Sequence, residues 1–296
     1  MSGELATPVT FRPASEPDLE DEWAVFMAAQ SELHDRRGAP LPSRPFEPAG
    51  MWARVHRHLL EHDAERAFVA EEDGRIVGFT AALRRADCWY FSALFIDPDF
   101  QGTGIGRRLL ELASHSTCRR RMTITEAIQP VSNGLYSRHG LLPVTPVLAF
   151  AGRPRIASGD EALEQGVVTP AALAELDQAA YGFDRRVDHE FWARNCERAT
   201  VWWREGRPCA YSYRGGFAGL IGPVAGCDPA SAAAALRNEL ADTGDADVVV
   251  NIPGSATELA RVAIDAGLRL GDPGLLLLAP PDPPPTAYAI HSYWLG

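Results

Sequence analysis

Residues 101–107 have a composition and spacing that could bind a phosphate group. They read Gln-Gly-Thr-Gly-Ile-Gly-Arg and follow a short apolar run, residues 91–96, that ends at Asp97-Pro98. A β-strand that leads through a glycine turn into a helix points backbone N–H groups, and the positive end of the helix dipole, at one place. Glycine suits such a turn because a Cβ would hold the ligand away from the backbone. The segment therefore predicts an anion-binding turn suited to a diphosphate.

Two common nucleotide-binding motifs do not fit this turn. A dinucleotide-binding fingerprint requires a third glycine where Arg107 stands, and a phosphate loop of the NTPase type requires a lysine. The sequence contains no lysine at all. The pattern Gln-x-x-Gly-x-Gly, formed by Gln101, Gly104 and Gly106, instead resembles the diphosphate-binding signature of the GCN5-related N-acetyltransferases (GNAT family).

This resemblance implies a binding site for acetyl-CoA. Backbone groups of the strand before the turn would hold the pantetheine arm and the thioester oxygen, and the turn would hold the diphosphate. The residues concerned are Leu94, Phe95 and Ile96 in the strand, followed by Gln101, Gly102, Thr103, Gly104, Ile105, Gly106 and Arg107 in the turn.

The resemblance also implies a general acid. Family members commonly place a tyrosine four residues before a helix-ending glycine, and Tyr136 stands four residues before Gly140. A phenol is protonated at neutral pH, so it can donate a proton as the thiolate of CoA leaves. Where relatives often have an asparagine, seven residues earlier, this chain has Gln129. We expect Gln129, with Asn133, to hydrogen-bond the cofactor arm.

The general base is not evident from the sequence. Relatives often carry a glutamate or histidine on the central strand, at positions occupied here by Tyr90 and Ser92, and neither is a ready base at neutral pH. Glu126, at the end of the next expected strand, is our candidate. Glu32 and Asp35 remain alternatives.

The elements that must position these residues alternate between strands and helices. Period-2 and period-3.6 patterns predict strands at 9–12, 66–71, 75–84, 121–126 and 144–151, and helices at 16–33, 51–62 and 131–139. A hairpin is expected at Asp73-Gly74. The order predicts an α/β fold with a mixed sheet, and it resembles the GNAT fold over roughly the first 155 residues.

The second half of the chain repeats this order in weakened form. Glu65-Arg66-Ala67 recurs as residues 197–199, and Gly74-Arg75 recurs as Gly206-Arg207. Strands are expected at 221–224 and 248–252, and helices at 229–240 and 258–266. We therefore predict two tandem GNAT folds, a first copy at 1–155 and a degenerate second copy at 156–296, with a linker near 154–160.

The second copy lacks the residues that carry the chemistry. Asp228, expected to cap the 229–240 helix, would occupy the N–H groups that an anion needs and would repel a diphosphate. Ala263 stands where the first copy has Tyr136. We expect one acetyl-CoA site per chain, in the first copy.

Composition limits the possible partners. The first 155 residues carry 18 arginines against 20 acids (−2), and the remainder carries 10 against 19 (−9). An acidic second half is a poor surface for nucleic acid. Five cysteines without a Cys-x-x-Cys pair, no signal-like N-terminus and no membrane-length apolar run are typical of a cytoplasmic protein. His56, His58 and His62 share one expected helix, where we predict a solvated face rather than a metal site.

These observations together predict a cytoplasmic acetyltransferase that moves an acetyl group from acetyl-CoA to a primary amine of a small molecule by direct transfer. Two alternatives stay open: a non-catalytic protein that binds or senses acyl-CoA, and a protein N-terminal or lysine acetyltransferase. The aromatic chain end, residues 288–296, is expected to form a last strand of the second copy. Alternatively, it places Tyr293, Trp294 or the terminal carboxylate beside the acceptor.

Overall fold

The computed structural model describes residues 8–114, 117–156, 158–217, 219–279 and 282–296, so Ala157 in the predicted linker lies outside the described residues. The chain divides into two compact units. One comprises Met1–Arg84 and Trp89–Cys118, and the other Arg85–Cys88 and Arg119–Gly296. Both combine helices with sheets, which confirms the predicted α/β class. No helix in these ranges is both long and apolar enough to cross a membrane.

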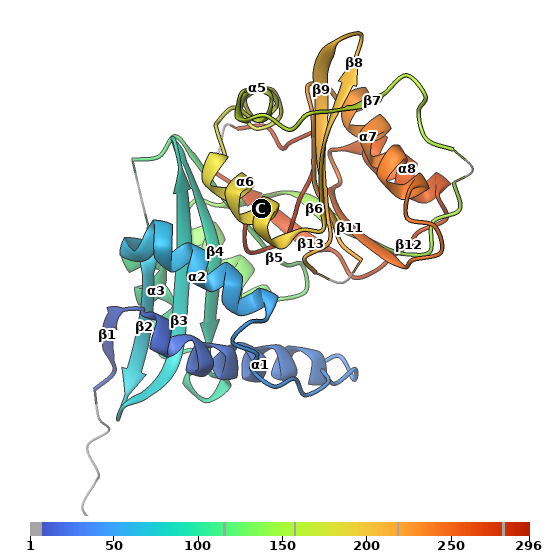
Figure 1. Cartoon of the computed structure of the whole chain (residues 1–296). Helices are drawn as coiled ribbons and strands as arrows, with labels where there is room; N and C mark the ends of the chain where they lie inside the picture. The colour runs from blue at the N-terminus through green and yellow to red at the C-terminus, as the bar shows by residue number, and fades with distance from the viewer. Residues whose placement is uncertain (1–7, 115–116, 157, 218, 280–281) are drawn as a thin grey trace, which may run out of the picture. The chain divides into compact units, whose positions relative to one another are not determined.

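The first unit contains a sheet in the order β1-β2-β3-β4, and its pairings β1–β2 and β2–β3 are antiparallel. The hairpin between β2 and β3 places Asp73 and Gly74 at positive φ, as a tight turn requires. Figure 1 shows α1 and α2 on one face of this sheet and α3 on the other. The strands are β1 (Thr10–Pro13), β2 (Ala67–Glu72), β3 (Arg75–Arg85) and β4 (Cys88–Ile96); the helices are η1 (Glu16–Asp18), α1 (Leu19–Asp35), α2 (Met51–Asp63), η2 (Ala64–Arg66), η3 (Pro98–Phe100) and α3 (Ile105–Ala113).

The α3 face of this sheet has its own apolar core. Ala70 and Val77 from the strands pack with Ile105 and Leu109 from α3, all at most 5% exposed. Gly78 on β3 leaves room for a side chain of the neighbouring strand, because a Cβ there would lie only 2.8 Å from Cδ1 of Ile96. The glycine therefore lets the Ile96 side chain pack in this core.

The second unit contains two sheets. The first has the order β5-β13-β6-β11, with β12 also on β6, and all of its pairings are antiparallel. β13 lies between β5 and β6, although those two strands are neighbours in sequence: Leu276 faces Ile124 on one side and Thr145 on the other. This insertion was not predicted. The strands are β5 (Arg120–Glu126), β6 (Leu142–Gly152), β11 (Val248–Pro253), β12 (Arg269–Leu270) and β13 (Gly274–Leu278).

The second sheet of this unit has the order β14-β10-β9-β8-β7. A parallel bridge between Leu220 and Val249 and an antiparallel bridge between Asn251 and Ile290 connect it to the first sheet. Its strands are β7 (Glu164–Gly166), β8 (Arg198–Arg204), β9 (Arg207–Arg214), β10 (Ile221–Gly226) and β14 (Tyr288–Ala289); the helices of the unit are α4 (Pro130–Arg138), α5 (Pro170–Ala180), α6 (Arg186–Asn195), α7 (Pro229–Ala241) and α8 (Thr257–Asp265).

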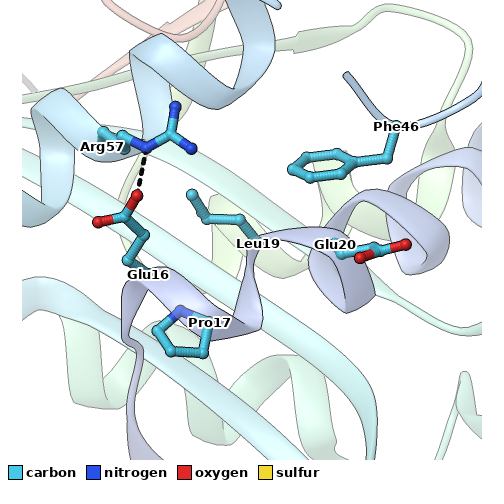
Figure 2. A pocket seen from close by; sticks show the side chains of 6 residues that line it. All are labelled: Glu16, Pro17, Leu19, Glu20, Phe46 and Arg57. Carbon is cyan, nitrogen blue, oxygen red and sulfur yellow. Dashed lines mark hydrogen bonds and ion pairs between the residues drawn. The ribbon is translucent and has the colours of Figure 1, made fainter. Parts of the chain in front are cut away.

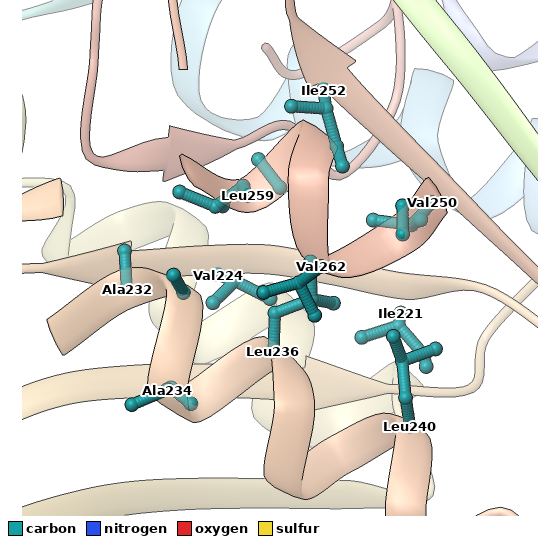
Figure 3. Close-up of a cluster of buried hydrophobic side chains, with 14 of the residues drawn as sticks. Ile221, Val224, Ala232, Ala234, Leu236, Leu240, Val250, Ile252, Leu259 and Val262 are labelled. Carbon is teal, nitrogen blue, oxygen red and sulfur yellow. The ribbon is translucent and has the colours of Figure 1, made fainter. Parts of the chain in front are cut away.

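Two helices and two strands enclose the main core of this unit (Figure 3). Ile221 on β10, Leu236 on α7, Val250 on β11 and Leu259 on α8 are all fully buried. These elements match those expected for the second copy. The boundary between the two predicted sequence copies, between residues 155 and 156, concerns an internal duplication and not the compact units described above. This boundary stays a prediction.

Candidate functional site

The predicted anion-binding turn is held at both ends by its own side chains. The N–H group of Asp97 donates to the carbonyl of Val77 at 2.9 Å, and the Asp97 carboxylate accepts from the N–H group of Asp99. The side-chain amide of Gln101 donates to the carbonyl of Ile96 at 3.2 Å, and the Thr103 hydroxyl donates to that of Phe100 at 2.7 Å. Gln101 and Thr103 therefore shape the turn, and their side-chain donors are already engaged.

The glycines of the turn adopt backbone conformations that other residues rarely tolerate. Gly102 has φ +79° and Gly104 has φ +94°, both in the left-handed region. No described atom lies within 4 Å of the position that a Cβ would take on either residue. A Cβ would thus project into open space beside the backbone, which is the space that a bound anion would use.

The backbone donors of the turn are available. The N–H group of Arg108 is the first of α3 to donate within the helix, to the carbonyl of Gly104 at 3.1 Å. Among the described residues, none accepts a hydrogen bond from the N–H groups of residues 102–107. The Arg107 side chain is exposed and pairs with Glu111 at 2.8 Å. A strand, a glycine turn and a helix whose first N–H groups have no described acceptor form an arrangement that suits a phosphate group.

The strand before the turn presents its side chains to opposite faces. Leu94 and Ile96 pack against the α3 core, whereas the Phe95 ring lies on the other face. The carbonyl of Ile96 already accepts from Gln101. Tyr90 and Ser92, at the positions where relatives carry a base, are buried.

In the second unit, the predicted cofactor ligands Gln129 and Asn133 lie at the start of α4. The carbonyl of Gln129 accepts from the N–H group of Asn133 at 3.2 Å, and the Asn133 side-chain NH₂ group donates to the carbonyls of Glu126 and Ala127. The side-chain oxygens of Gln129 and Asn133 are buried and accept no hydrogen bond from a described residue. A buried acceptor without a donor costs about 1–3 kcal/mol, so both oxygens suit the amide N–H groups of a ligand.

Tyr136 lies on α4, two residues before the helix ends, and is 5% exposed. Burial raises the pKa of its phenol above the ordinary value, which keeps the group protonated throughout the physiological range. The side chain is therefore a potential donor of one proton, as the predicted acid must be.

Glu126 ends β5 and is half-buried, and its register partner on β13 is Gly274. The phenol of Tyr293 lies against this glycine, because a Cβ on Gly274 would come within 2.3 Å of the phenol oxygen. Burial raises the pKa of Tyr293, and the negative charge of Glu126 raises it further. The structure thus brings Glu126 and Tyr293 together at one end of β5. The aromatic chain end was the one sequence signal for this contact.

The chain end is bound inside the second unit. Tyr288 and Ala289 form β14 on β10, which agrees with the expected last strand. Arg185 donates to the Tyr288 hydroxyl at 2.8 Å and to the carbonyls of Leu295 and Gly296. The Gly296 oxygen also accepts from the Tyr288 hydroxyl at 3.2 Å and from the N–H group of His291 at 3.4 Å, so it is engaged by three donors instead of being available as a base.

The alternative bases lie on α1. One oxygen of the Glu32 carboxylate pairs with Arg36 and the other is buried without a described partner, whereas Asp35 is exposed at the end of the helix. The solvated histidine face predicted on α2 is wrong for two of its three members. His56 and His58 are 3% and 5% exposed, and His56 pairs with Glu22 at 3.2 Å. No group of three or more His, Cys, Asp or Glu side chains in the described ranges could hold a metal ion.

The corresponding places in the second copy are closed. The Asp228 carboxylate caps α7 and accepts from the N–H group of Ser231 at 2.7 Å. Burial alone would raise the pKa of Asp228, but the hydrogen bonds from Ser231 lower it. A Cβ on Gly226 would lie 2.4 Å from the Ala232 nitrogen, so α7 starts directly against the strand. Ala263 is fully buried in α8 and offers no acid.

A separate pocket of about 370 Å³ lies at the start of α1 (Figure 2). Leu19 and Phe46 supply its apolar wall, and the carboxylate of Glu16 pairs with Arg57 at 2.6 Å across one side. Its lining includes none of the residues predicted for the cofactor or for catalysis, so we do not assign the transfer reaction to it.

Comparison with known proteins places this geometry in a family. The sequence profile of the acetyltransferase (GNAT) domain matches residues 63–140. An uncharacterized N-acetyltransferase of Archaeoglobus fulgidus is 30% identical over 122 residues, which cover 39% of this chain and 78% of the relative. Another, from Methanocaldococcus jannaschii, is 34% identical over 132 residues, 42% of this chain and 54% of its own length, so the match spans about half of that relative. The chain belongs to the GNAT family of N-acetyltransferases.

Solved structures show the same fold. A putative acetyltransferase from Pyrococcus horikoshii has a TM-score of 0.75 at 17% identity, and the match covers 100% of this chain and 99% of that one. A tandem GNAT protein from the clavulanic acid biosynthesis pathway has a TM-score of 0.58 at 14% identity. The match covers 93% of this chain and 100% of that protein. The predicted family and the tandem GNAT fold class are thereby confirmed.

Proposed function

We propose that this protein transfers an acetyl group from acetyl-CoA to a primary amine of a small molecule, with one cofactor site per chain. The N–H groups of residues 102–107 carry this proposal, because six donors without a described acceptor, with open space at Gly102 and Gly104, suit a diphosphate at a helix start. When bound, acetyl-CoA supplies the activated acyl group. The buried oxygens of Gln129 and Asn133 would accept from amide N–H groups of its pantetheine arm.

The transfer is a direct one in this proposal. The neutral amine nitrogen attacks the thioester carbonyl, the new C–N bond forms and the C–S bond breaks. The backbone of residues 94–96 would polarise the carbonyl oxygen. Glu126 would take the proton that the amine nitrogen loses, and Tyr136 would give its phenol proton to the departing thiolate. Glu126 then releases its proton to solvent and the Tyr136 phenolate is reprotonated from solvent, so the products are an amide and free CoA.

One observation favours a second candidate function, an acyl-CoA-binding protein without catalysis. The buried Tyr90 and Ser92 provide no ready base on β4. A protein of this kind would bind acetyl-CoA and release no thiol in the presence of amines.

Two measurements distinguish the candidates. Titration calorimetry with acetyl-CoA should give one site per chain, and a thiol-release assay with a panel of primary amines should give amine-dependent CoA formation. Two equivalent sites would contradict the single-site assignment. Binding without release for any amine would support the non-catalytic protein.

A further inference from the structure

The face of the first unit's sheet opposite α3 carries a continuous row of aromatic side chains. We call this row the aromatic face and define it by Trp23, Phe26, Trp52, Phe79 and Phe95. The Phe95 ring meets Phe26 edge-to-face at 5.0 Å and stacks on Phe79 at 5.5 Å. Trp23 contacts Phe26 at 5.4 Å and Trp52 at 5.3 Å. The row therefore runs from β4 across α1 to α2.

The row combines buried and accessible members. Phe79 and Trp52 are buried and form its base, whereas Trp23, Phe26 and Phe95 are half-buried. Aromatic rings gain most when they are fully removed from water, so these half-buried rings would gain further from an apolar ligand that covers them. The half-buried members lie on α1 (Trp23 and Phe26) and at the end of β4 (Phe95).

One carboxylate next to this row is already paired. The Glu22 carboxylate, 4% exposed, pairs with the His56 ring at 3.2 Å, and that ring stacks on Trp52 at 3.9 Å. Glu22 is thus engaged beneath the row instead of facing a ligand. A ligand that contacts Phe26 and Phe95 meets carbon surface and π faces.

We infer that the acceptor amine carries an aromatic or bulky aliphatic body that packs on Phe26 and Phe95. The inference rests on the proposed function, because the backbone of Phe95 belongs to the segment that would hold the thioester. When such an amine binds beside β4, its apolar body would be removed from water by packing on these two rings, which favours binding. A polyol or a second ammonium group would instead lose hydration there without gaining a partner.

The test compares two amines that differ mainly in the body. Phenethylamine and ethanolamine are assayed with acetyl-CoA by thiol release, and the ratio of their kcat/KM values is measured. Burying a phenyl ring should favour phenethylamine by about 10- to 100-fold. In Phe26→Ala this ratio should fall about 10-fold, and in the milder Phe26→Leu it should fall less. Phe46→Ala is the matched control, because Phe46 contacts Trp52 but lies outside the aromatic face, and it should preserve the ratio.

The outcomes separate this inference from the proposed function. A ratio near or below one in the wild type, or an unchanged ratio in both Phe26 variants, overturns the inference while leaving the acetyltransfer proposal intact. Preference for an amino sugar such as glucosamine over phenethylamine does the same. Absence of thiol release with every amine overturns both. If Phe26→Ala fails to fold, Phe26→Leu decides on its own.

Discussion

Helices α3 and α7 each begin after a strand, but the first N–H groups of α3 have no described acceptor, whereas those of α7 are capped. At α3, Gly102 and Gly104 leave open space and free donors, whereas at α7 the Asp228 carboxylate accepts from Ser231 and Gly226 lies against the helix. An N-cap stabilises a helix by satisfying its donors, and an anion site requires those donors to stay free. A few residues at a helix start thus decide between stability and binding.

The helices that follow show the same contrast. Tyr136 on α4 provides a buried phenol, and Ala263 on α8 provides only packing. Changes in the first copy should therefore act on binding and turnover, and changes in the second copy should act on stability. The predictions below test this division, from the largest expected effect to the smallest.

Tyr136→Phe should lower turnover by ~10²–10⁴-fold, because the thiolate would lose its proton donor. Acetyl-CoA affinity should hardly change, since the ring remains. Steady-state thiol release and titration calorimetry measure the two quantities. Unchanged turnover would make Tyr136 a packing residue like Ala263.

Gly104→Asp gives α3 the kind of acid that α7 has, and it should weaken acetyl-CoA binding by ~100-fold or more through repulsion of the diphosphate. Gly74→Asp is the matched control, because Gly74 also has positive φ and open space but lies in the β2–β3 hairpin. Calorimetry with both variants separates the charge effect from backbone strain. Equal losses in the two would argue against a diphosphate site at residues 102–107.

His291 should control the acid stability of the second unit. Burial, reinforced by the charge of Arg185, lowers the pKa of His291 to about 3. The unfolded chain binds this proton near pH 6.5, so the free energy of unfolding should fall as pH drops below 6.5 towards 3, by ~2 kcal/mol between pH 7 and 5. Urea unfolding of His291→Gln should lack this contribution, whereas the more exposed His62→Gln should keep it. Equal pH slopes for all three proteins would contradict the assignment.

Tyr293 is an expected exception to this division of roles, because it belongs to the predicted second copy but lies beside Glu126 of the first. Tyr293→Phe should lower turnover about 10-fold and shift the acid limb of the pH–rate profile, because its hydroxyl lies beside the carboxylate expected to take the amine proton. A loss of about 1.4 kcal/mol of transition-state stabilisation corresponds to this tenfold change. Melting temperature and acetyl-CoA affinity should change little. A wild-type pH–rate profile in this variant would confine the chain end to a structural role.

Asp228→Ala should have the smallest effect. Loss of the N-cap should destabilise the protein by ~1 kcal/mol, while acetyl-CoA binding stays at one site, because Gly226 still leaves no space before α7. Denaturant unfolding and calorimetry test the two parts. A second binding site in this variant would show that the carboxylate alone had closed the second copy.

Local patterns were sufficient to predict most elements. The hairpin at Asp73-Gly74, the glycine turn before α3 and the cap at Asp228 each depend on a few neighbouring residues, and the structure contains all three. The roles of the cofactor-binding and catalytic residues remain predictions.

Local sequence patterns could not predict the pairings between residues that are far apart in the sequence. The insertion of β13 between β5 and β6 depends on residues about 150 positions apart, and the apolar run at 274–278 does not specify its partners. The burial of His56 depends on Glu22 from another helix, and the contact of Tyr293 with Gly274 depends on the β13 insertion. Each of these three features depends on a contact with a residue that is far away in the sequence, which a short stretch of sequence does not reveal.

The position of β13 also determines when the sheet that contains β5 and β6 can be completed during synthesis. A ribosome releases β5 and β6 more than 120 residues before it releases residues 274–278, so during synthesis each of these strands exposes an edge that only β13 will later occupy. At 5–20 residues per second, this interval is on the order of ten seconds. Unpaired strand edges invite association with other chains, so the nascent protein would benefit most from a chaperone during that interval.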